Sequence, residues 1–446
     1  MTMPTVLVLA ALLALGLLNQ IAGPTLVVAW GAVAVLVAYI VVLFFRDLVS
    51  LFLAVPFFAV LLPVVLSNLY IEHGGYISEQ GVHGEPTGST LRIVGYCIVF
   101  FATIQFVVSQ VAARIPRASV DVDRFALWAK LVHGAVLLGS LGVLVIFGSP
   151  FLEGIDRFDY WSQLPGLLDR IPFLIALCCA ATAVAIALRD KLDWVLLALL
   201  AVSVIILVLF AEKFTGLYTA LVYSVGVAYT ARIRFVNPSI KLGPLLIGGS
   251  LAAVALAALA TVGFMVFHGY NTSNVLQKLL DRALGLQGHV WYGVDRLLQT
   301  QGPSGDLTHL LPGREGDWGG VTLLMYEISP TAFVDRMVAN GLRFTMGGPG
   351  LISYVFGYGA GAVVFAVAGL MAGAVLGYLL FAIARLRTIS LLVGLYGVRL
   401  MINVFMLGDV TDLWKPLSFA FWGWVAIDLL LVRLGRSRRD SALATA

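Results

Sequence analysis

Ionisable side chains are scarce in this sequence, so those in unusual places are the first candidates for chemistry. Charged residues make up 12% of the 446-residue chain, whereas apolar residues make up 60%. Arg399 stands near the middle of an apolar run that is long enough to cross a lipid bilayer. A guanidinium there is costly unless it faces water or an anion. We therefore treat Arg399 as a candidate residue for binding an anion.

A second group of candidates lies in one long polar segment, residues 269–349. From Val275 to Leu298, apolar residues recur at three- and four-residue steps, which predicts an amphipathic helix. The opposite face would carry a narrow stripe of basic side chains and one histidine: Lys278, Arg282, His289 and Arg296. Such a stripe at a membrane surface suits a phosphate or pyrophosphate group, and the alternative is a surface helix with solvated basic residues. Gly285 and Gly288 could divide this helix in two.

The second half of the segment is rich in glycine, between Gly302 and Gly320 and again between Asn340 and Pro349. Glycines in this number predict a backbone bent to fit a ligand, and the alternative is a loop that packs on itself and caps the bundle. The polar candidates of this half are two arginines and two glutamates: Arg314, Arg343, Glu315 and Glu327. Glu327 follows apolar residues in a predicted helix, where burial would raise its pKa.

The elements that must position these residues are apolar runs that recur from one end of the chain to the other. A transmembrane helix needs about 20 apolar residues, and the runs between polar breaks amount to about twelve spans. The predicted spans are 3–19, 25–45, 48–69, 92–113, 126–148, 171–189, 193–211, 214–231, 243–268, 358–384, 388–408 and 416–433. We expect an all-α polytopic membrane protein, with residues 1–446 as a single membrane domain and 269–349 as a large loop within it.

The placement of lysine and arginine predicts which side each loop faces, because these residues stay on the cytoplasmic side of short loops. If the N-terminus is cytoplasmic, every short basic loop and the basic C-terminal tail fall on the cytoplasmic side. Both termini are then cytoplasmic, and residues 70–91, 149–170 and 269–349 face outward. Because the cytoplasmic loops are all short, any chemistry is expected on the outer side.

Several kinds of site are absent from the sequence. It has no Walker A loop, no GxGxxG between a strand and a helix, no HExxH and no GxSxG. Its three cysteines, Cys97, Cys178 and Cys179, all fall in apolar runs without the spacing of metal ligands. We therefore expect no metal, no cofactor and no nucleic-acid partner.

Two short stretches and the overall layout resemble a known group of membrane enzymes. The stretches are Arg282-Ala283-Leu284-Gly285-Leu286-Gln287-Gly288-His289-Val290-Trp291-Tyr292 and Gly341-Leu342-Arg343-Phe344-Thr345-Met346-Gly347, the second followed by Pro349. They are similar to elements of Wzy-type repeat-unit polysaccharide polymerases. The layout of the whole chain resembles that of bacterial O-antigen polymerases and ligases, which are glycosyltransferases of the GT-C type. Those families have a similar number of spans and a large periplasmic loop between the ninth and tenth.

The resemblance implies a metal-independent enzyme of the bacterial inner membrane that polymerises oligosaccharide repeat units linked to undecaprenyl pyrophosphate. It would move the growing glycan from its lipid pyrophosphate to a hydroxyl of the next lipid-linked unit. Cations would stabilise the leaving pyrophosphate, and the candidates are Lys278, Arg282, Arg314, Arg343 and Arg399. A general base would serve the acceptor hydroxyl, and three candidates stay open: His289, Glu315 and Glu327. The implied partners are the lipid-linked oligosaccharides, membrane lipid and a chain-length regulator.

The position of Arg399 in its span predicts its depth in the bilayer. It lies about eleven residues, or roughly 16 Å, from the cytoplasmic end of the span at 1.5 Å per residue. That depth is about half of the hydrocarbon core. We expect Arg399 to line an outward-open cavity and to face Arg343 or Arg282 across it, with the lipid pyrophosphate between them.

Three other kinds of membrane protein are alternatives to a polymerase. An O-antigen ligase shares the layout and the donor but transfers to a lipid A-core acceptor, and nothing in the sequence identifies the acceptor. A lipid-linked oligosaccharide flippase or other secondary transporter should show paired repeats and polar groups near the midplane, whereas this chain gathers its polar residues in one loop. Other GT-C enzymes, such as oligosaccharyltransferases, have a large first outer loop with a catalytic acid. Here that loop is only about Asn19–Pro24 and contains no acid.

Overall fold

Apolar runs fold as helices here because a backbone in lipid can satisfy its N–H and C=O groups only within its own segment. The computed structural model describes residues 3–115, 121–166, 168–189, 191–212, 215–236, 284–311, 319–339, 342–344 and 346–444. Most of them are helical. The long helices are α1 (Met3–Ala22), α2 (Leu26–Arg46), α4 (Val55–Glu72), α5 (Ser89–Arg114), α6 (Val122–Phe147), α9 (Ile171–Leu188), α10 (Trp194–Leu209), α11 (Thr215–Phe235), α17 (Gly348–Ala384), α18 (Thr388–Ile402) and α19 (Pro416–Ala444).

Shorter elements join the long helices. They are α3 (Leu48–Leu53), α7 (Pro150–Glu153), α8 (Arg157–Ser162), η1 (Leu168–Arg170), η4 (Asn403–Leu407) and η5 (Val410–Trp414). The described part of the long loop, residues 269–349, contains α14 (His289–Gln301), η3 (Leu307–Leu310), α15 (Gly320–Ile328) and α16 (Thr331–Ala339). One antiparallel hairpin, β1 (Tyr76–Ile77) and β2 (Val82–His83), follows α4 and pairs Tyr76 with His83.

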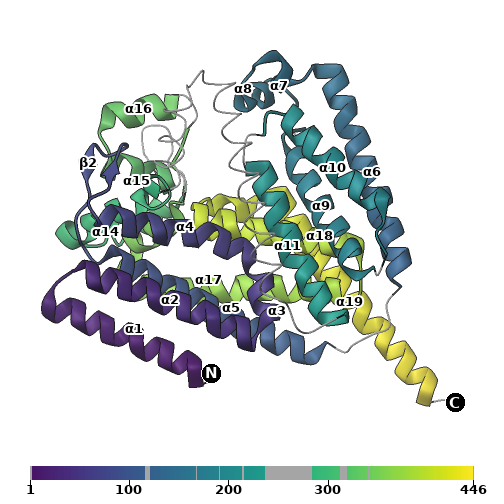
Figure 1. The fold of residues 1–446 in the computed structure, drawn as a ribbon, viewed down its shortest axis with the longest axis horizontal. Coiled ribbons are helices and arrows are strands. Elements are labelled where there is room, and N and C mark those ends of the chain that lie inside the picture. The colour runs from purple at the N-terminus through teal and green to yellow at the C-terminus, as the bar shows by residue number, and fades with distance from the viewer. Residues whose placement is uncertain are drawn as a thin grey trace.

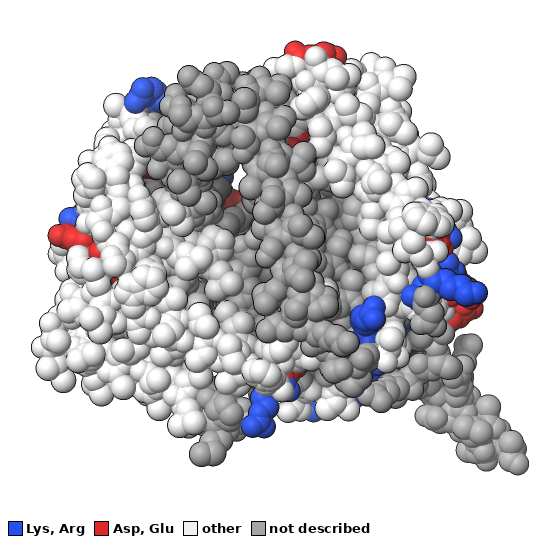
Figure 2. All heavy atoms as spheres, in the orientation of Figure 1, with Lys and Arg blue, Asp and Glu red and all other residues white. Residues whose placement is uncertain are grey.

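Within the described residues, seven helical segments are long and apolar enough to cross a membrane. They are Leu26–Arg46, Val55–Glu72, Ser89–Arg114, Val122–Glu153, Leu168–Leu188, Gly348–Ala384 and Thr388–Leu407. Three shorter apolar helices accompany them: Val6–Ala22, Trp194–Leu209 and Pro416–Leu431. On the face in Figure 2, most of the described atoms belong to uncharged residues, and most of the visible charged side chains lie near the edges. The chain is therefore an all-α membrane protein.

The helices begin and end close to the predicted spans, with two informative differences. The predicted span 48–69 is divided into α3 and α4, because Pro56 lacks the N–H that a continuous helix would use. The predicted span 358–384 starts earlier, since α17 already begins at Gly348 and bends at Gly357, where φ is +71°. Residues that the sequence assigned to the long loop thus belong to this helix. The predicted span 243–268 lies outside the described residues.

Figure 1 shows two groups of helices. On the left, α1, α2, α4, α5 and α17 lie together, and on the right α6, α9, α10 and α11 form a second group, with α18 and α19 beside them. In the first group, α5 and α17 pack closely because α17 presents small residues to its neighbour. A side chain at Gly369 would collide with Thr103 and lie 2.6 Å from the carbonyl oxygen of Phe100. These contacts allow the two backbones to approach each other.

The helix α14 is the part of the long loop that is held most firmly by the bundle. It begins at His289 after a turn at residues 286–288, and the part of the predicted helix before residue 284 lies outside the described residues. A Cβ atom on Gly288 would lie 2.5 Å from the side-chain nitrogen of Asn68 on α4. The expected exposed cationic face is not formed within α14, because His289 is only 2% exposed while Arg296 reaches the surface. The physical reason is that α4, α5 and α17 surround its first turns.

Candidate functional site

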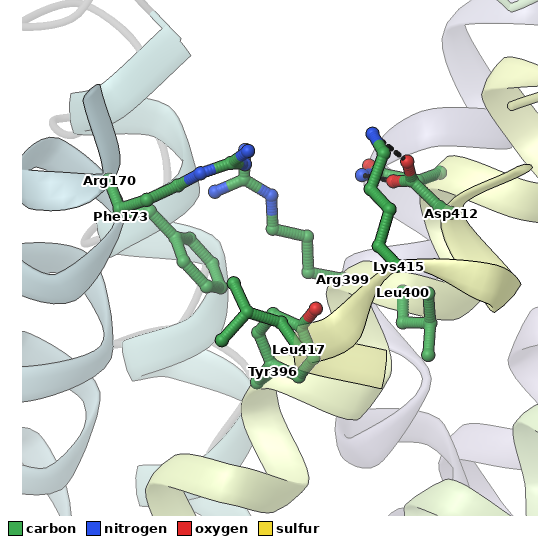
Figure 3. Close-up of a pocket in the computed structure, with 9 residues that line it drawn as sticks. Arg170, Phe173, Tyr396, Arg399, Leu400, Asp412, Lys415 and Leu417 are labelled. Atoms are coloured by element: carbon green, nitrogen blue, oxygen red, sulfur yellow. Dashed lines mark hydrogen bonds and ion pairs between the residues drawn. The ribbon is translucent and has the colours of Figure 1, made fainter. Parts of the chain in front are cut away.

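Arg399 lines a small, partly open pocket at the end of α18 that leads into η4 (Figure 3). Three separate parts of the chain form its walls: the start of α9, the end of α18, and the turn before α19. The lining residues are Arg170, Phe173, Tyr396, Arg399, Leu400, Asn403, Asp412, Lys415 and Leu417. The volume is about 40 Å³, room for about three water-sized spheres.

Positive charge predominates in this pocket, which we call the Arg399 pocket. Arg170, Arg399 and Lys415 contribute three cations, and Asp412 contributes one acid. The guanidinium groups of Arg170 and Arg399 lie close to each other in Figure 3. Two of the cations have acidic partners: the Nε atom of Arg170 lies 3.1 Å from a carboxylate oxygen of Asp169, and Lys415 forms an ion pair with Asp412.

Arg399 has an aromatic neighbour instead of an acidic one. Its guanidinium carbon lies 4.0 Å from the centroid of the Phe173 ring. Such a contact stabilises a cation by about 0.5–2 kcal/mol. No carboxylate in the described part of the chain forms an ion pair with Arg399. A guanidinium that lies beside a second guanidinium, over an aromatic ring, is an arrangement that an anion would stabilise.

Two helix N-termini add to the positive potential. The first turn of α9 follows Arg170 directly, and α19 begins at Pro416 directly after Lys415. The N-terminal end of a helix carries a partial positive charge and unpaired N–H groups, so anions bind there. Proline in the first turn of each helix fits this place, since its missing N–H would have no helical partner. The pocket therefore combines two helix ends with three cationic side chains.

The acid of the pocket is fixed in place. The side-chain nitrogen of Asn403 donates to an Asp412 carboxylate oxygen at 2.6 Å, and the Ser418 hydroxyl donates to the Asp412 backbone carbonyl at 2.5 Å. Asn403 starts the π-helical turn η4, which is followed by Gly408 with φ of +87°. These contacts hold Lys415 at the pocket through its ion pair with Asp412.

Arg343 lies near the Arg399 pocket but not across it from Arg399, which corrects the sequence-based expectation. Its Nη1 atom lies 3.9 Å from a carboxylate oxygen of Asp409, and both side chains are about half exposed. Burial and the neighbouring Asp412 carboxylate raise the pKa of Asp409. The residue that faces Arg399 is Arg170 instead. Arg282, the other expected partner, lies outside the described residues.

Close backbone packing brings Arg343 to this position. The segment after α16 leads into Gly348, whose backbone lies against the carbonyl group of Phe405 in η4. A Cβ atom on Gly408 would in turn lie 3.3 Å from the backbone nitrogen of Gly348. Only glycines allow the backbones at Gly348 and Gly408 to lie so close together. This contact places the end of the long loop against the turn that contains Asp409.

His289, one of the three candidate bases, is the first residue of α14 and is buried against the end of the long loop. Its Nδ1 atom lies 2.7 Å from the carbonyl oxygen of Leu286, and its ring meets Phe344 edge-on at a centroid distance of 4.5 Å. Its Nε2 atom has no partner among the described residues. Burial lowers the pKa of His289 below its ordinary value of 6.5, while the Glu79 carboxylate opposes this shift. The imidazole is therefore neutral at pH 7.

Glu327, the second candidate base, lies exposed on α15 and is not part of the Arg399 pocket. The other predicted site residues lie outside the described part of the chain: Lys278, Arg282, Arg314 and Glu315. Three residues of the pocket were not predicted from the sequence: Arg170, Lys415 and Asp412. For Lys415 a local signal existed, because it stands directly before the proline that starts a span. Arg170 stands among acidic loop residues, and nothing local indicates that its helix packs against α18.

A buried ion pair fixes α14 relative to the membrane helices. Arg92 of α5 donates from Nε and Nη2 to the two carboxylate oxygens of Asp295, both at 2.6 Å. The Tyr358 hydroxyl of α17 donates to the same carboxylate at 2.7 Å, and Gln299 donates to it at 2.9 Å. Asp295 is 1% exposed. Because its carboxylate is fully used, this network positions the loop rather than binding a ligand.

Comparisons with known proteins identify one likeness. Residues 314–421 match a family of unknown function (DUF6418), and this segment is about a quarter of the chain. It contains the α18 and η4 walls of the Arg399 pocket together with Asp412, Lys415 and Arg343. No curated protein and no solved structure matches the chain.

Proposed function

We propose that the protein polymerises oligosaccharide repeat units that are linked to undecaprenyl pyrophosphate, on the extracytoplasmic side of the bacterial inner membrane. The observation that carries the proposal is the close approach of the Arg399 and Arg170 guanidinium groups in the Arg399 pocket. Two guanidinium groups so close together repel each other, and a pyrophosphate with two or more negative charges removes this repulsion. Arginine also offers the bidentate contacts that phosphate oxygens favour.

In the proposed reaction, the bond between the anomeric carbon of the donor glycan and its pyrophosphate oxygen breaks. A new bond forms from that carbon to a hydroxyl oxygen of the acceptor unit, and the hydroxyl proton passes to a base. The leaving pyrophosphate gains negative charge as the bond breaks, so cations positioned around it lower the barrier. Arg399, Arg170 and Lys415 would perform this role, with Arg343 nearby and with Lys278, Arg282 and Arg314 as further candidates.

The base for the acceptor hydroxyl is still open among His289, Glu315 and Glu327. The proposed topology has about twelve spans, with both termini in the cytoplasm and the long loop outside. It follows from the apolar runs and from the distribution of basic residues. A ligase that uses the same donor is the principal alternative, and a transporter of lipid-linked oligosaccharides is the next one.

The test is complementation of a host strain that lacks the gene, with the length distribution of the surface glycan as the readout. We expect Arg399→Gln to remove products longer than one repeat unit at unchanged protein level. Arg399→Lys should restore polymer only partly, because a point charge replaces a planar fork. The matched control is Arg46→Gln, which removes an exposed arginine at the end of α2. Normal polymer from Arg399→Gln would refute the proposal.

The same strains distinguish the alternatives. A ligase would leave full-length glycan on its lipid pyrophosphate carrier when Arg399 is replaced. A transporter would leave single lipid-linked units on the cytoplasmic side of the membrane. A polymerase would leave single units attached to their final acceptor on the outer side.

A further inference from the structure

We propose that Asp409 is the general base that takes the proton from the acceptor hydroxyl. The inference rests on the proposed function and adds a fourth candidate for the one role that the function leaves open. Asp409 lies in the turn between η4 and η5, beside the Arg399 pocket. Its main chain is held firmly there, while its carboxylate is accessible.

The backbone of Asp409 is attached to two residues that line the pocket. Its N–H donates to the carbonyl oxygen of Asn403 at 2.9 Å, and its own carbonyl oxygen accepts from the N–H of Asp412 at 3.0 Å. Asn403 and Asp412 both line the Arg399 pocket. Gly408, with φ of +87°, turns the chain out of η4 just before Asp409. Main-chain contacts therefore fix the position of Asp409 relative to the pocket.

The carboxylate of Asp409, in contrast, can meet a substrate. Its side chain is 46% exposed, and it accepts no hydrogen bond from the described part of the chain. Its one ion pair there joins it to Arg343 at 3.9 Å, which is longer than a hydrogen bond of about 2.7–3.2 Å. A sugar hydroxyl can therefore approach this carboxylate without displacing a strong contact.

The charges around Asp409 suit the role of a base. Burial and the Asp412 carboxylate raise its pKa, while Arg343 and Lys415 act in the opposite direction. A carboxylate with a raised pKa is a stronger base than a solvated aspartate. The Asp412 carboxylate also acts on Arg399. The proposed base and the proposed pyrophosphate site are therefore both neighbours of the same acid.

The other described candidates fit the role less well. His289 is only 2% exposed. Glu327 lies on α15 and is not part of the pocket. Asp412 lines the pocket, but its carboxylate is held by contacts with Asn403 and Lys415. Of these groups and the aspartate after η4, only the latter combines an accessible carboxylate with a place beside the pocket.

In the proposed step, Asp409 accepts the hydroxyl proton while the hydroxyl oxygen forms its bond to the anomeric carbon. The bond from that carbon to the pyrophosphate oxygen breaks, and its electron pair remains on the leaving pyrophosphate. Arg399 and Arg170 stabilise the charge that develops there. The protonated Asp409 then releases its proton to water. General base catalysis of this kind contributes about 10²–10⁴-fold to a rate.

The experiment compares catalysis with binding in the purified full-length protein in nanodiscs. The substrate is the lipid-linked repeat unit extracted from a host strain that lacks the gene, and the readout is the initial rate of polymer formation. We expect Asp409→Asn to lower kcat at least about hundredfold, while KM and the affinity for inorganic pyrophosphate change less than about threefold. Asp159→Asn, which neutralises an exposed acid of α8, should leave all three values unchanged.

Two further measurements separate a base from a residue that only supports the fold. The kcat of the wild type should fall as the pH is lowered towards the pKa of Asp409, and the residual activity of Asp409→Asn should not show this fall. Added formate should restore part of the activity of Asp409→Ala, because a small carboxylate can occupy the place of the missing side chain and take the proton. A structural role would not respond to formate.

Unchanged binding of inorganic pyrophosphate shows that each variant is folded. If Asp409→Asn does not fold, Asp409→Glu is the second variant, and it should lower kcat but keep the fall at acid pH. A kcat of Asp409→Asn within about tenfold of the wild type would overturn the assignment, as would a loss of pyrophosphate binding. If Asp409→Asn polymerises normally while Arg399→Gln does not, the proposed function stands without this base. If the wild-type protein forms no polymer from the extracted units, the proposed function itself fails.

Discussion

The guanidinium carbon of Arg399 lies 4.0 Å from the centroid of the Phe173 ring, so the two residues join the end of α18 to the beginning of α9. The contact orients the cation toward Arg170 and leaves the N–H groups at the edge of the guanidinium available. An aromatic ring stabilises a cation without neutralising it. The site can therefore keep a positive charge ready for an incoming anion, which an aspartate at position 173 would not allow.

Replacement of this ring should weaken anion binding without removing a charge. Phe173→Leu loses the aromatic face but keeps an apolar side chain, so the position of Arg399 is less restricted. We expect a three- to tenfold weaker affinity of the purified protein for inorganic pyrophosphate, within the roughly 0.5–2 kcal/mol of such contacts. Phe173→Tyr is the control, because it keeps the ring and should bind as the wild type does. Equal affinity of the leucine variant would mean that packing alone positions Arg399.

The Arg92–Asp295 pair should be essential for stability. Asp295→Asn would leave a largely buried guanidinium without its charged partner, which costs about 3–5 kcal/mol. We expect a clear fall of the Tm of the purified protein, measured in detergent. The double variant Arg92→Met with Asp295→Leu should recover much of the loss, since replacing both partners by apolar groups is often neutral. A double variant that is less stable than the single one would contradict this account.

His289 should make the protein sensitive to acid. Its pKa in the folded protein is lowered from 6.5 by burial, so the unfolded chain binds a proton that the folded protein does not. The neutral His289 therefore contributes its full share to the free energy of unfolding above about pH 6.5. This contribution decreases as the pH falls below that value. His289→Gln should flatten the Tm profile between pH 7 and pH 5, and His83→Gln, at an exposed site, should not. If the Tm of His289→Gln decreases between pH 7 and pH 5 as much as that of the wild type, another group causes the decrease.

The proposed topology can be tested independently of activity. Reporter fusions should give a cytoplasmic signal at three positions: Pro116, Ile240 and Arg436. They should give an outside signal at three others: Gly81, Gly154 and Gly305. An outside signal from position 240 would overturn the orientation, because adjacent loops alternate between the two sides of the membrane. Fusions at 81 and 305 should agree in any case, since Gln80 donates to the carbonyl of His289 across the two loops.

The helices could be predicted because an apolar run of membrane length has few other folded forms. Arg399 could be identified for the same reason, since its charge stands out against its surroundings. Its neighbours could not be identified. Arg170 approaches it only because α9 packs against α18, a contact between segments more than 200 residues apart in the sequence.

The burial of His289 could not be predicted from the sequence for a related reason. Helical periodicity distinguishes apolar from polar positions but does not indicate how many neighbours a helix has. The sequence places His289 on the polar face of the predicted helix, where an isolated amphipathic helix would meet water. In the folded chain, Phe344 and the turn at Leu286 cover it. Packing of Phe344 and of the turn at Leu286 thus outweighed the polarity of this one residue.

The distance in sequence between Arg92 and Asp295, 203 positions, has a consequence for biosynthesis. A ribosome adds about 5–20 residues per second, so α5 enters the membrane roughly 10–40 seconds before its partner is made. During that interval Arg92 must reach the water at the membrane surface with its long side chain. Its place in the first turn of α5, rather than deeper in the helix, makes this possible. The final position of α14 is thus set late, after most of the chain has been inserted.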